Sequence, residues 1–455
     1  MKKKVISFMM VSVMILSAFG LAGCSNQGNG NTSNNSGSDS STQAASEQED
    51  TANTDEKVKI RILTRLAGSP ANEVAFRERV EQFRVEYPHI EVEDLSISDE
   101  GSYDSKFKAF AAAGDVPELF ATYGGGSFRS YVEGGVALDL TEAMAADKEW
   151  SDSFLPIFEN FQYEGIEGTY AVPYEFFAIQ LFYNKALFEQ IGVEPPKTIE
   201  EFESVSDRFL EEGIIPMALG EKDKWRAGHL FACLLNKRLG AEQNYALANR
   251  TAKYNDSDMM EIYELIDEWS QKGYFGENPV STDHTAEKAM FHNGQTAMHM
   301  NGSWYVTEAL ESENADNISV VSFPYFADFP EHEKIGMGGA GGAFAISTTA
   351  SPEQQAAAIE LLKYVTNKEA FESYAKVQNG GVFPMPIEQD PETTPPLWIE
   401  YAETVSSGEF YAEVYSYDPL NTMLDKVRDE LQGMFVGQSP EDTANNIQAE
   451  IDSNE

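Results

Sequence analysis

From residue 57 onward, hydrophobic residues recur either at every second position, as in a strand, or at helical spacing. Residues 57–63 (KVKIRIL) carry apolar side chains at every second position, which predicts a strand. Residues 70–88 carry them at helical spacing and end in proline, and residues 89–95 (HIEVEDL) return to a strand pattern. A helix over 103–113 and an apolar strand over 116–123 follow. A strand, a helix and a second strand within about 40 residues predict a parallel sheet with a right-handed crossover.

Later helices are marked by capping residues. Thr198 with Glu201, and Ser351 with Gln354, have the spacing at which a hydroxyl caps the first turn and the side chain three residues on bonds back. Ser439, followed by proline, opens the last predicted helix. Helices of this kind between strands predict an α/β fold.

The first 23 residues have the pattern of a secretory signal. Three lysines precede an apolar span over residues 5–21. Ala22 and Gly23 in front of Cys24 resemble a bacterial lipobox, in which the signal is cut before a cysteine that carries lipid. The alternative is an uncleaved transmembrane helix, but the span is short against the roughly 20 apolar residues needed. We therefore expect a signal peptide over 1–23 and a lipidated Cys24.

Residues 24–56 are predicted to form a disordered tether. After the cysteine they hold Asn, Ser, Gly, Gln, Thr and acids, with alanine as the only apolar type, so they cannot form a core. Two acyl chains would make a stable anchor. We expect the folded part at the extracellular face of the cell membrane, or in the periplasm if the source cell has an outer membrane.

Charge and cysteine content narrow the function classes. The chain has 75 acids against 32 basic residues, a formal net charge of -43. Binding to nucleic acid or to anionic headgroups is disfavoured because both need a basic face. Cys233 lies in the apolar stretch HLFACLLN, which predicts a buried thiol and leaves no disulfide framework.

The length of the chain predicts two lobes. The part after residue 57 has about 400 residues, which is too long for one hydrophobic core.

Three segments carry a family resemblance, namely residues 168–202 (GTYAVPYEFFAIQLFYNKALFEQIGVEPPKTIEEF), 291–304 (FHNGQTAMHMNGSW) and 341–367 (GGAFAISTTASPEQQAAAIELLKYVTN). In this order they resemble family 1 extracellular solute-binding proteins of sugar ABC transporters, the group that includes maltose-binding protein. The resemblance implies a type II periplasmic-binding fold, a sugar in the cleft between two lobes, and delivery to permease subunits. It implies a monomer without cofactor or metal.

The same resemblance implies how the chain divides between the lobes. The chain would cross near residues 178–183, 338–342 and 408–417. The expected ranges are 57–178 plus 342–410 for lobe 1, and 179–341 plus 411–455 for lobe 2. The glycine-rich stretch GMGGAGGAF, residues 336–344, is not a phosphate loop, because no Gly-Lys-Ser/Thr follows. Glycines at a crossing instead permit close backbone approach.

A sugar site needs aromatic faces and polar groups for hydroxyls. Trp304 is the main candidate, because it follows the strand-like TAMHMN and a Gly-Ser turn and opens a helix, at the strand end where α/β sheets bind ligands. The alternative is a core tryptophan. Tyr174 and Glu175 enter the first crossing, where they offer a ring and a carboxylate. Phe176 and Phe177 beside them serve either the ligand or packing.

Topology adds further candidates. Arg65 follows the first strand and Tyr123 the third, and Trp225 lies in the polar stretch EKDKWRAGH, predicted as a loop. Arg65 equally suits an ion pair with one of the many acids. Trp225 could cap a helix or stack on sugar, and stacking on sugar is the preferred interpretation. Tyr415 and Tyr417 near the third crossing are possible ring platforms.

Enzyme alternatives have little support. The sequence holds no H-E-x-x-H and no G-x-S-x-G. A carboxylate pair for glycoside hydrolysis stays open, since with 75 acids some pair always falls in range. A peptide or metal receptor of the same architecture also stays open. The preferred interpretation is a binding protein that closes around its sugar by a hinge motion.

Overall fold

The computed structural model describes residues 57–155, 157–163, 165–420 and 422–454. The predicted signal peptide, the lipidation site Cys24 and the tether lie outside these residues. Within them, no helix is both long enough and apolar enough to cross a membrane.

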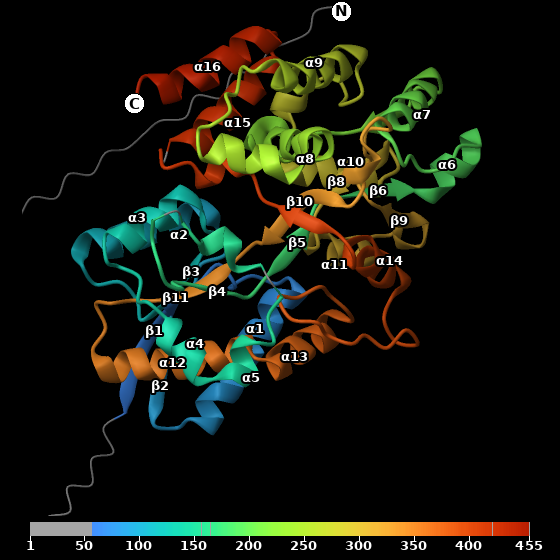
Figure 1. Ribbon diagram of the computed structural model, residues 1–455. Coiled ribbons are helices and arrows are strands. Elements are labelled where there is room, and N and C mark those ends of the chain that lie inside the picture. Colours follow the sequence, from blue (N-terminus) through green and yellow to red (C-terminus); the bar gives the residue numbers. More distant parts are fainter. Residues whose placement is uncertain (1–56, 156, 164, 421, 455) are drawn as a thin grey trace, which may run out of the picture. The chain divides into compact units, whose positions relative to one another are not determined.

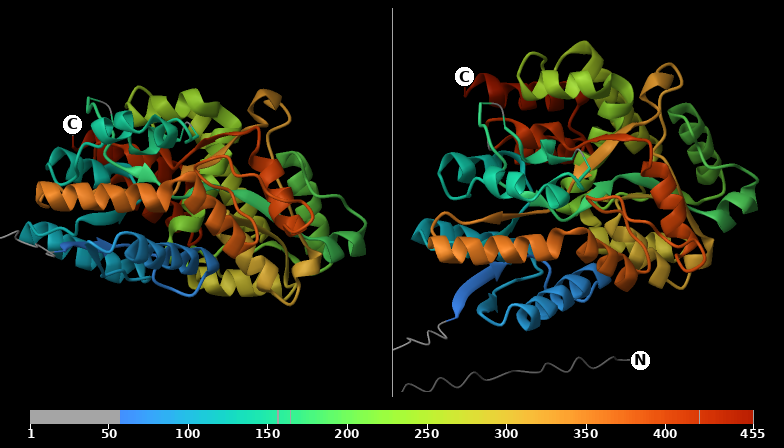
Figure 2. Two further views of the ribbon diagram at one scale, coloured as in Figure 1. Left: turned by 90° about the horizontal axis from the view of Figure 1, so that it is seen from below. Right: turned by 60° about the horizontal axis from the view of Figure 1, so that its bottom comes forward.

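The first sheet has five strands in the order β2-β1-β3-β11-β4. β1 is parallel to β2 and β3, as the strand and helix spacing predicted, whereas β11 is antiparallel to both of its neighbours. Its elements and the helices around it are β1 (Val58–Leu63), α1 (Ala71–Glu86), β2 (Ile90–Asp94), α2 (Glu100–Ala113), β3 (Leu119–Thr122), α3 (Gly125–Glu133), α4 (Thr141–Ala146), α5 (Lys148–Ser151), β4 (Val172–Pro173), β11 (Ala343–Ile346), α12 (Pro352–Thr366) and α13 (Lys368–Gln378). Figure 2 shows α12, in orange, alongside α1, in blue.

The second sheet has four strands in the order β7-β8-β6-β9. β6 is antiparallel to β8 and β9, and β7 is parallel to β8. Its elements and helices are β6 (Gln180–Asn184), α6 (Lys185–Ile191), α7 (Ile199–Glu211), β7 (Ile215–Met217), α8 (Trp225–Ala248), α9 (Ser257–Lys272), α10 (His284–His292), β8 (Thr296–Asn301), α11 (Trp304–Glu311), β9 (Ile318–Val321), α14 (Pro396–Val405), α15 (Met423–Met434) and α16 (Pro440–Asp452). Helices α9, α15 and α16 gather beyond α8, on its side away from the first sheet (Figure 1).

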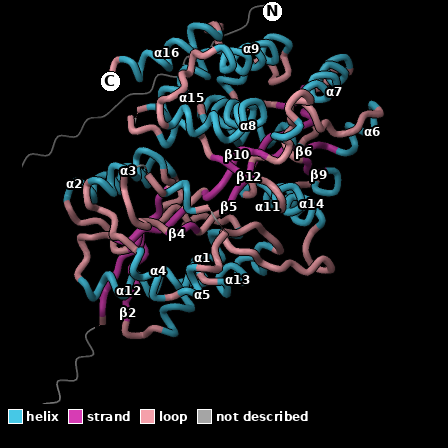
Figure 3. The backbone as a smooth tube through the Cα atoms, viewed as in Figure 1, coloured by secondary structure: helices cyan, strands magenta, loops and turns pink. Residues whose placement is uncertain are grey.

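A third, small sheet joins the two larger ones. It has the order β12-β10-β5 and consists of β5 (Phe176–Ala178), β10 (Ile335–Ala340) and β12 (Glu409–Tyr411). β10 is antiparallel to β5 and parallel to β12. Each strand overlaps or adjoins one of the three predicted crossings, and Figure 3 traces them between the larger sheets. Three segments far apart in the sequence therefore meet at one place.

Two large hydrophobic cores flank this sheet. The first gathers side chains from residues 60–172 and 340–385, and the second from residues 177–337 and 414–451. Cys233 is buried in the second core, and burial raises the pKa of its thiol to about 12, which confirms the predicted inert cysteine. A smaller cluster packs α14 against β9 and α11, although α14 comes from the stretch assigned to lobe 1. The exact lobe boundaries stay a prediction.

The predicted helix caps are present. The Thr198 hydroxyl accepts a hydrogen bond from Glu201 N at 3.2 Å, and the Glu201 carboxylate accepts one from Thr198 N at 3.3 Å. Ser351 and Gln354 form the same reciprocal pair, at 3.3 and 3.1 Å. Ser439 caps α16 by accepting from Asp442 N at 3.1 Å. Local sequence therefore sets where these helices begin.

Candidate binding site

Two aromatic side chains stand out by exposure. Tyr123 is 42% exposed and Trp304 is 37% exposed, and every other Phe, Tyr or Trp whose burial the structure describes is buried or half-buried. Tyr123 directly follows β3 of the first sheet, and Trp304 opens α11 just after β8 of the second. Both lie at carboxyl ends of strands, the position predicted for ligand contacts in α/β sheets.

The arginine–tyrosine group consists of Arg65, Tyr123 and Tyr174. The Arg65 guanidinium carbon lies 5.1 Å from the centre of the Tyr123 ring, a cation–π contact. The Tyr174 hydroxyl donates to the Tyr123 hydroxyl at 3.4 Å. Phe344 of β11 packs against this group: its ring stacks on that of Tyr174, with 4.3 Å between the ring centres. The ends of β1, β3 and β4 thus bring together three residues predicted separately.

Glu175 follows Tyr174 and adds a carboxylate. Burial raises its pKa to about 7, against partial compensation by Arg65 and by a backbone hydrogen bond from Gly342. A β-carbon at Gly341 would lie 2.9 Å from the Glu175 Oε2 atom and 3.0 Å from Phe177 Cδ1. The glycine run therefore allows close approach of side chains to the crossing, as the sequence predicted.

The raised pKa of Glu175 predicts a pH effect on stability. Its ordinary pKa is 4.5 and its folded-state pKa is about 7, so the folded protein holds this proton more tightly than the unfolded chain does. That contribution is complete below the ordinary pKa and is lost as pH rises through 7. Glu175→Gln should therefore lose less stability than wild type between about pH 5 and about pH 8 in urea melts. The exposed Glu194→Gln is the control, and equal pH slopes for wild type and Glu175→Gln would contradict the expectation.

The tryptophan group consists of Phe177, Trp225, His229 and Trp304. Ring centres of Phe177 and Trp304 are 5.4 Å apart, those of Trp225 and Trp304 are 6.5 Å apart, and those of Trp225 and His229 are 4.8 Å apart. A β-carbon at Gly302 would lie 2.5 Å from the Trp304 ring, so the Gly-Ser turn gives the indole its place. Only Trp304 of the group is exposed, and its ring contacts the rings of the other members.

A buried ion pair supports the tryptophan group. The Arg226 guanidinium donates to both carboxylate oxygens of Glu287, at 2.9 and 2.8 Å, and both side chains are fully buried. Burial would raise the pKa of Glu287, but Arg226 with hydrogen bonds from His284 and His299 holds it well below its ordinary value. The Arg226 guanidinium carbon lies 4.8 Å from the Trp225 ring centre. The pair fixes the start of α8 and hence Trp225.

His229 stays neutral beneath the two tryptophans. Burial lowers the pKa of its imidazole well below the ordinary value, and Arg226 and Arg428 lower it further. Its Nε2 atom lies 3.9 Å from the Glu413 carboxylate, which accepts hydrogen bonds from the Tyr415 hydroxyl at 2.7 Å and from Arg428 Nε at 3.2 Å. Glu175, the residue after Tyr174, and Phe177 of the tryptophan group both lie close to Gly341.

The comparisons with known proteins bear on what such a site belongs to. Residues 78–393 match the family model described as bacterial extracellular solute-binding protein. The chain belongs to this family. The resemblance inferred from the three sequence motifs is thereby confirmed, and so is the interpretation as a binding protein in place of an enzyme.

This solute-binding protein is also similar to individual proteins of other organisms. The multiple sugar-binding protein of Streptococcus mutans is 22% identical over 360 residues, covering 76% of this chain and 80% of that protein. An uncharacterized ABC transporter extracellular-binding protein of Pyrococcus horikoshii is 26% identical over 244 residues, which is 50% of this chain and 52% of that protein. The chain thus matches about half the length of that relative.

A solved structure establishes the fold. A chitin oligosaccharide binding protein superposes with a TM-score of 0.78 at 23% identity, covering 88% of this chain and 99% of that chain. The predicted two-lobed α/β fold of this solute-binding protein is confirmed. In the described part of the chain, no group of three or more His, Cys, Asp or Glu side chains has an arrangement that could hold a metal ion.

The structure differs from the sequence predictions at two aromatic positions, Trp225 and Tyr415. Trp225 does not lie in a loop but is the first residue of α8, because the Glu221 carboxylate, six residues before Ala227, accepts from Ala227 N at 2.6 Å and caps the helix. Tyr415 is buried in the second core, so it is no ring platform. Phe176, for which ligand contact and packing were both open, is buried. Its ring packs edge-on against that of Phe410, with 5.8 Å between the ring centres.

One residue of the tryptophan group was missed entirely. His229 follows Trp225 by one helical turn and therefore lies on the same face of α8. The signal was present in the sequence as a Trp and a His four positions apart. It went unused because the segment was predicted as a loop, where that spacing has no meaning.

Proposed function

We propose that this solute-binding protein is the lipid-anchored receptor of an ABC importer and binds an oligosaccharide between its two lobes. The observation that carries the proposal is the pair of exposed rings, Tyr123 beside the first core and Trp304 beside the second. Sugar rings have apolar faces that stack on aromatic side chains, so exposed rings at strand ends suit such a ligand. The S. mutans relative and the chitin oligosaccharide binding protein, by their names, bind sugars, which supports this ligand class.

The polar groups around the rings suit sugar hydroxyls. Arg65 supplies donors, the Glu175 carboxyl supplies acceptors, and the Tyr174 hydroxyl does both. We propose that Trp304 and Trp225 stack on the sugar while the arginine–tyrosine group completes the hydroxyl bonds after closure. The three strands of the small sheet form the hinge, and the closed monomer is the form that the permease subunits recognise.

A ligand screen tests the sugar proposal. The soluble part from Lys57 onward should gain thermal stability with at least one oligosaccharide in a panel that also contains peptides. At 100 times the dissociation constant a ligand adds about 2.7 kcal/mol to the free energy of unfolding. Solution scattering should show compaction with the same sugar, and the sugar should remain intact. Stabilisation by peptides alone, or steady hydrolysis of the bound sugar, would contradict the proposal.

A substitution at Cys24 tests the lipid anchor. Cys24→Ala should leave the folded part unchanged but release it from the membrane or leave its signal uncut, because the anchor is a thioether-linked lipid. Fractionation of cells with mass spectrometry of the N-terminus measures both outcomes. Cys233→Ala, which changes the other cysteine, should remain anchored. A Cys24→Ala protein that is processed and still membrane-bound would refute the anchor.

A further inference from the structure

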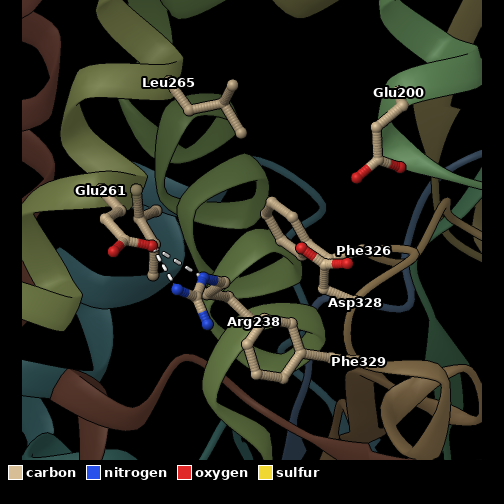
Figure 4. Close-up of a pocket in the computed structure, with 8 residues that line it drawn as sticks. Glu200, Arg238, Glu261, Leu265, Phe326, Asp328 and Phe329 are labelled. Atoms are coloured by element: carbon tan, nitrogen blue, oxygen red, sulfur yellow. Dashed lines mark hydrogen bonds and ion pairs between the residues drawn. The ribbon is translucent and has the colours of Figure 1, made fainter.

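A pocket lies beside α8, apart from the two aromatic groups described above. It has a volume of about 270 Å³ and is formed by α7, α8, α9 and the segment 326–329 between β9 and β10 (Figure 4). Its apolar lining comes from Ile262, Leu265, Phe326 and Phe329. None of its residues belongs to the arginine–tyrosine group or the tryptophan group. The pocket is therefore separate from the residues proposed to bind sugar.

One half of the pocket already holds a guanidinium. Arg238 Nε donates to Glu261 Oε2 at 2.9 Å, and its guanidinium carbon lies 4.2 Å from the centre of the Phe329 ring. A carboxylate at the edge and an aromatic face below are the two contacts that hold a guanidinium best. A carboxylate and an aromatic ring in the pocket lining therefore already bind one guanidinium group, that of Arg238.

The other half of the lining offers the same types of group, the ring of Phe326 and the carboxylates of Glu200 and Asp328. The Phe326 ring is half-buried, and both carboxylates are exposed. Glu200 is held beside the segment because it accepts from Ala327 N at 3.4 Å. In the part of the chain that the structure describes, no Lys or Arg lies within ion-pair distance of Glu200 or Asp328. Three carboxylates and one guanidinium give the lining a formal charge of 1 − 3 = −2.

We propose that this pocket binds a small organic cation, a guanidinium or primary ammonium on a short apolar stem. The stem packs against Phe326 and Leu265, and the cationic head lies between the carboxylates of Glu200 and Asp328. The volume is below the roughly 300 Å³ at which pockets for drug-sized ligands begin, which suits a ligand the size of one basic side chain.

Calorimetric titration of the soluble part with butylguanidinium tests this proposal. Two exposed charge pairs and one cation–π contact predict weak binding, with a dissociation constant on the order of 10 mM. Phe326→Ala should weaken binding about fivefold, which is the effect of one cation–π contact. Asp328→Lys should weaken it at least about tenfold, because it removes one carboxylate and adds a competing cation.

The control separates the pocket from the acidic surface as a whole. Asp316→Lys makes the same charge change at another exposed acid, in the turn before β9, and should leave binding unchanged. Thermal melts should show that all three variants fold like wild type. Equal weakening by Asp316→Lys and Asp328→Lys would mean diffuse attraction and would overturn the proposal. Absence of saturable binding, or binding of a tetra-arginine peptide without binding of butylguanidinium, would also overturn it.

Discussion

Trp304→Ala is expected to weaken sugar binding roughly thirtyfold while the fold remains nearly as stable as wild type. An aromatic hot spot costs about 2 kcal/mol of binding free energy or more when truncated. The indole is 37% exposed, so much of its surface is available to a ligand. Its ring contact with Phe177 is worth about 1 kcal/mol of folding stability. Titration calorimetry and urea melts on the same variant measure the two effects.

A core tryptophan gives the matched control. Trp269 is fully buried in the second core, so Trp269→Ala should cost about 3 to 5 kcal/mol of folding stability. Its binding should change only as far as the fold is lost. If Trp304→Ala behaves like Trp269→Ala, with a large loss of stability and unchanged affinity in the folded fraction, Trp304 does not belong to the site.

Arg226→Leu is expected to cost about 3 to 5 kcal/mol of folding stability. The substitution leaves the Glu287 carboxylate fully buried without its cation, and that uncompensated charge is the main penalty. Arg226 also donates to the Met300 carbonyl, so the change loosens α8 from β8 as well. Because α8 begins at Trp225, the same variant should bind sugar more weakly than its stability alone would predict.

Two comparisons separate charge from packing in this result. Arg226→Leu combined with Glu287→Leu removes both charges and should recover much of the loss, since apolar replacement of a buried pair is often neutral. Lys59→Ala breaks an exposed pair with Glu93 and should leave the folding stability nearly unchanged, because solvent screens the pair. If the double variant is no more stable than Arg226→Leu, the buried charge is not the cause.

The same variant has a predicted pH dependence. The depressed pKa of Glu287 contributes stability that is present above its ordinary value of 4.5 and is lost as pH falls toward the folded-state pKa. In Arg226→Leu this contribution is absent, and a protonated Glu287 needs no cation. The stability gap between wild type and variant should therefore narrow in acid, which urea melts on both sides of the ordinary pKa measure.

Local signals predicted much of the fold. Capping residues located the starts of α7, α12 and α16, and periodicity located β1, α1 and β2, because these features depend on neighbours within one or two turns. The strand order was not predictable in the same way. β11 lies between β3 and β4 only because long-range packing places it there. No local pattern in residues 343–346 names those partners.

The candidate site was predictable as separate residues but not as an arrangement. The strand-end rule selected Arg65, Tyr123 and Trp304 one at a time. That Arg65 lies over Tyr123, and that Tyr174 joins them, depends on the spacing of β1, β3 and β4 in the sheet. The cap that turns Trp225 into a helix start comes from Glu221 and matches none of the short capping motifs.

The place of β11 in the first sheet has a consequence for how the chain folds during synthesis. β3 and β4 are neighbours of β11 but not of each other, so the first sheet is complete only when Ala343 has been synthesised. A nascent chain that ends before this residue carries unpaired edges on both β3 and β4. Pairing over such long sequence separations slows folding, because loop closure must be paid before the contacts form. The first sheet is therefore expected to form late in synthesis, after both of the strands that flank β11 have been made.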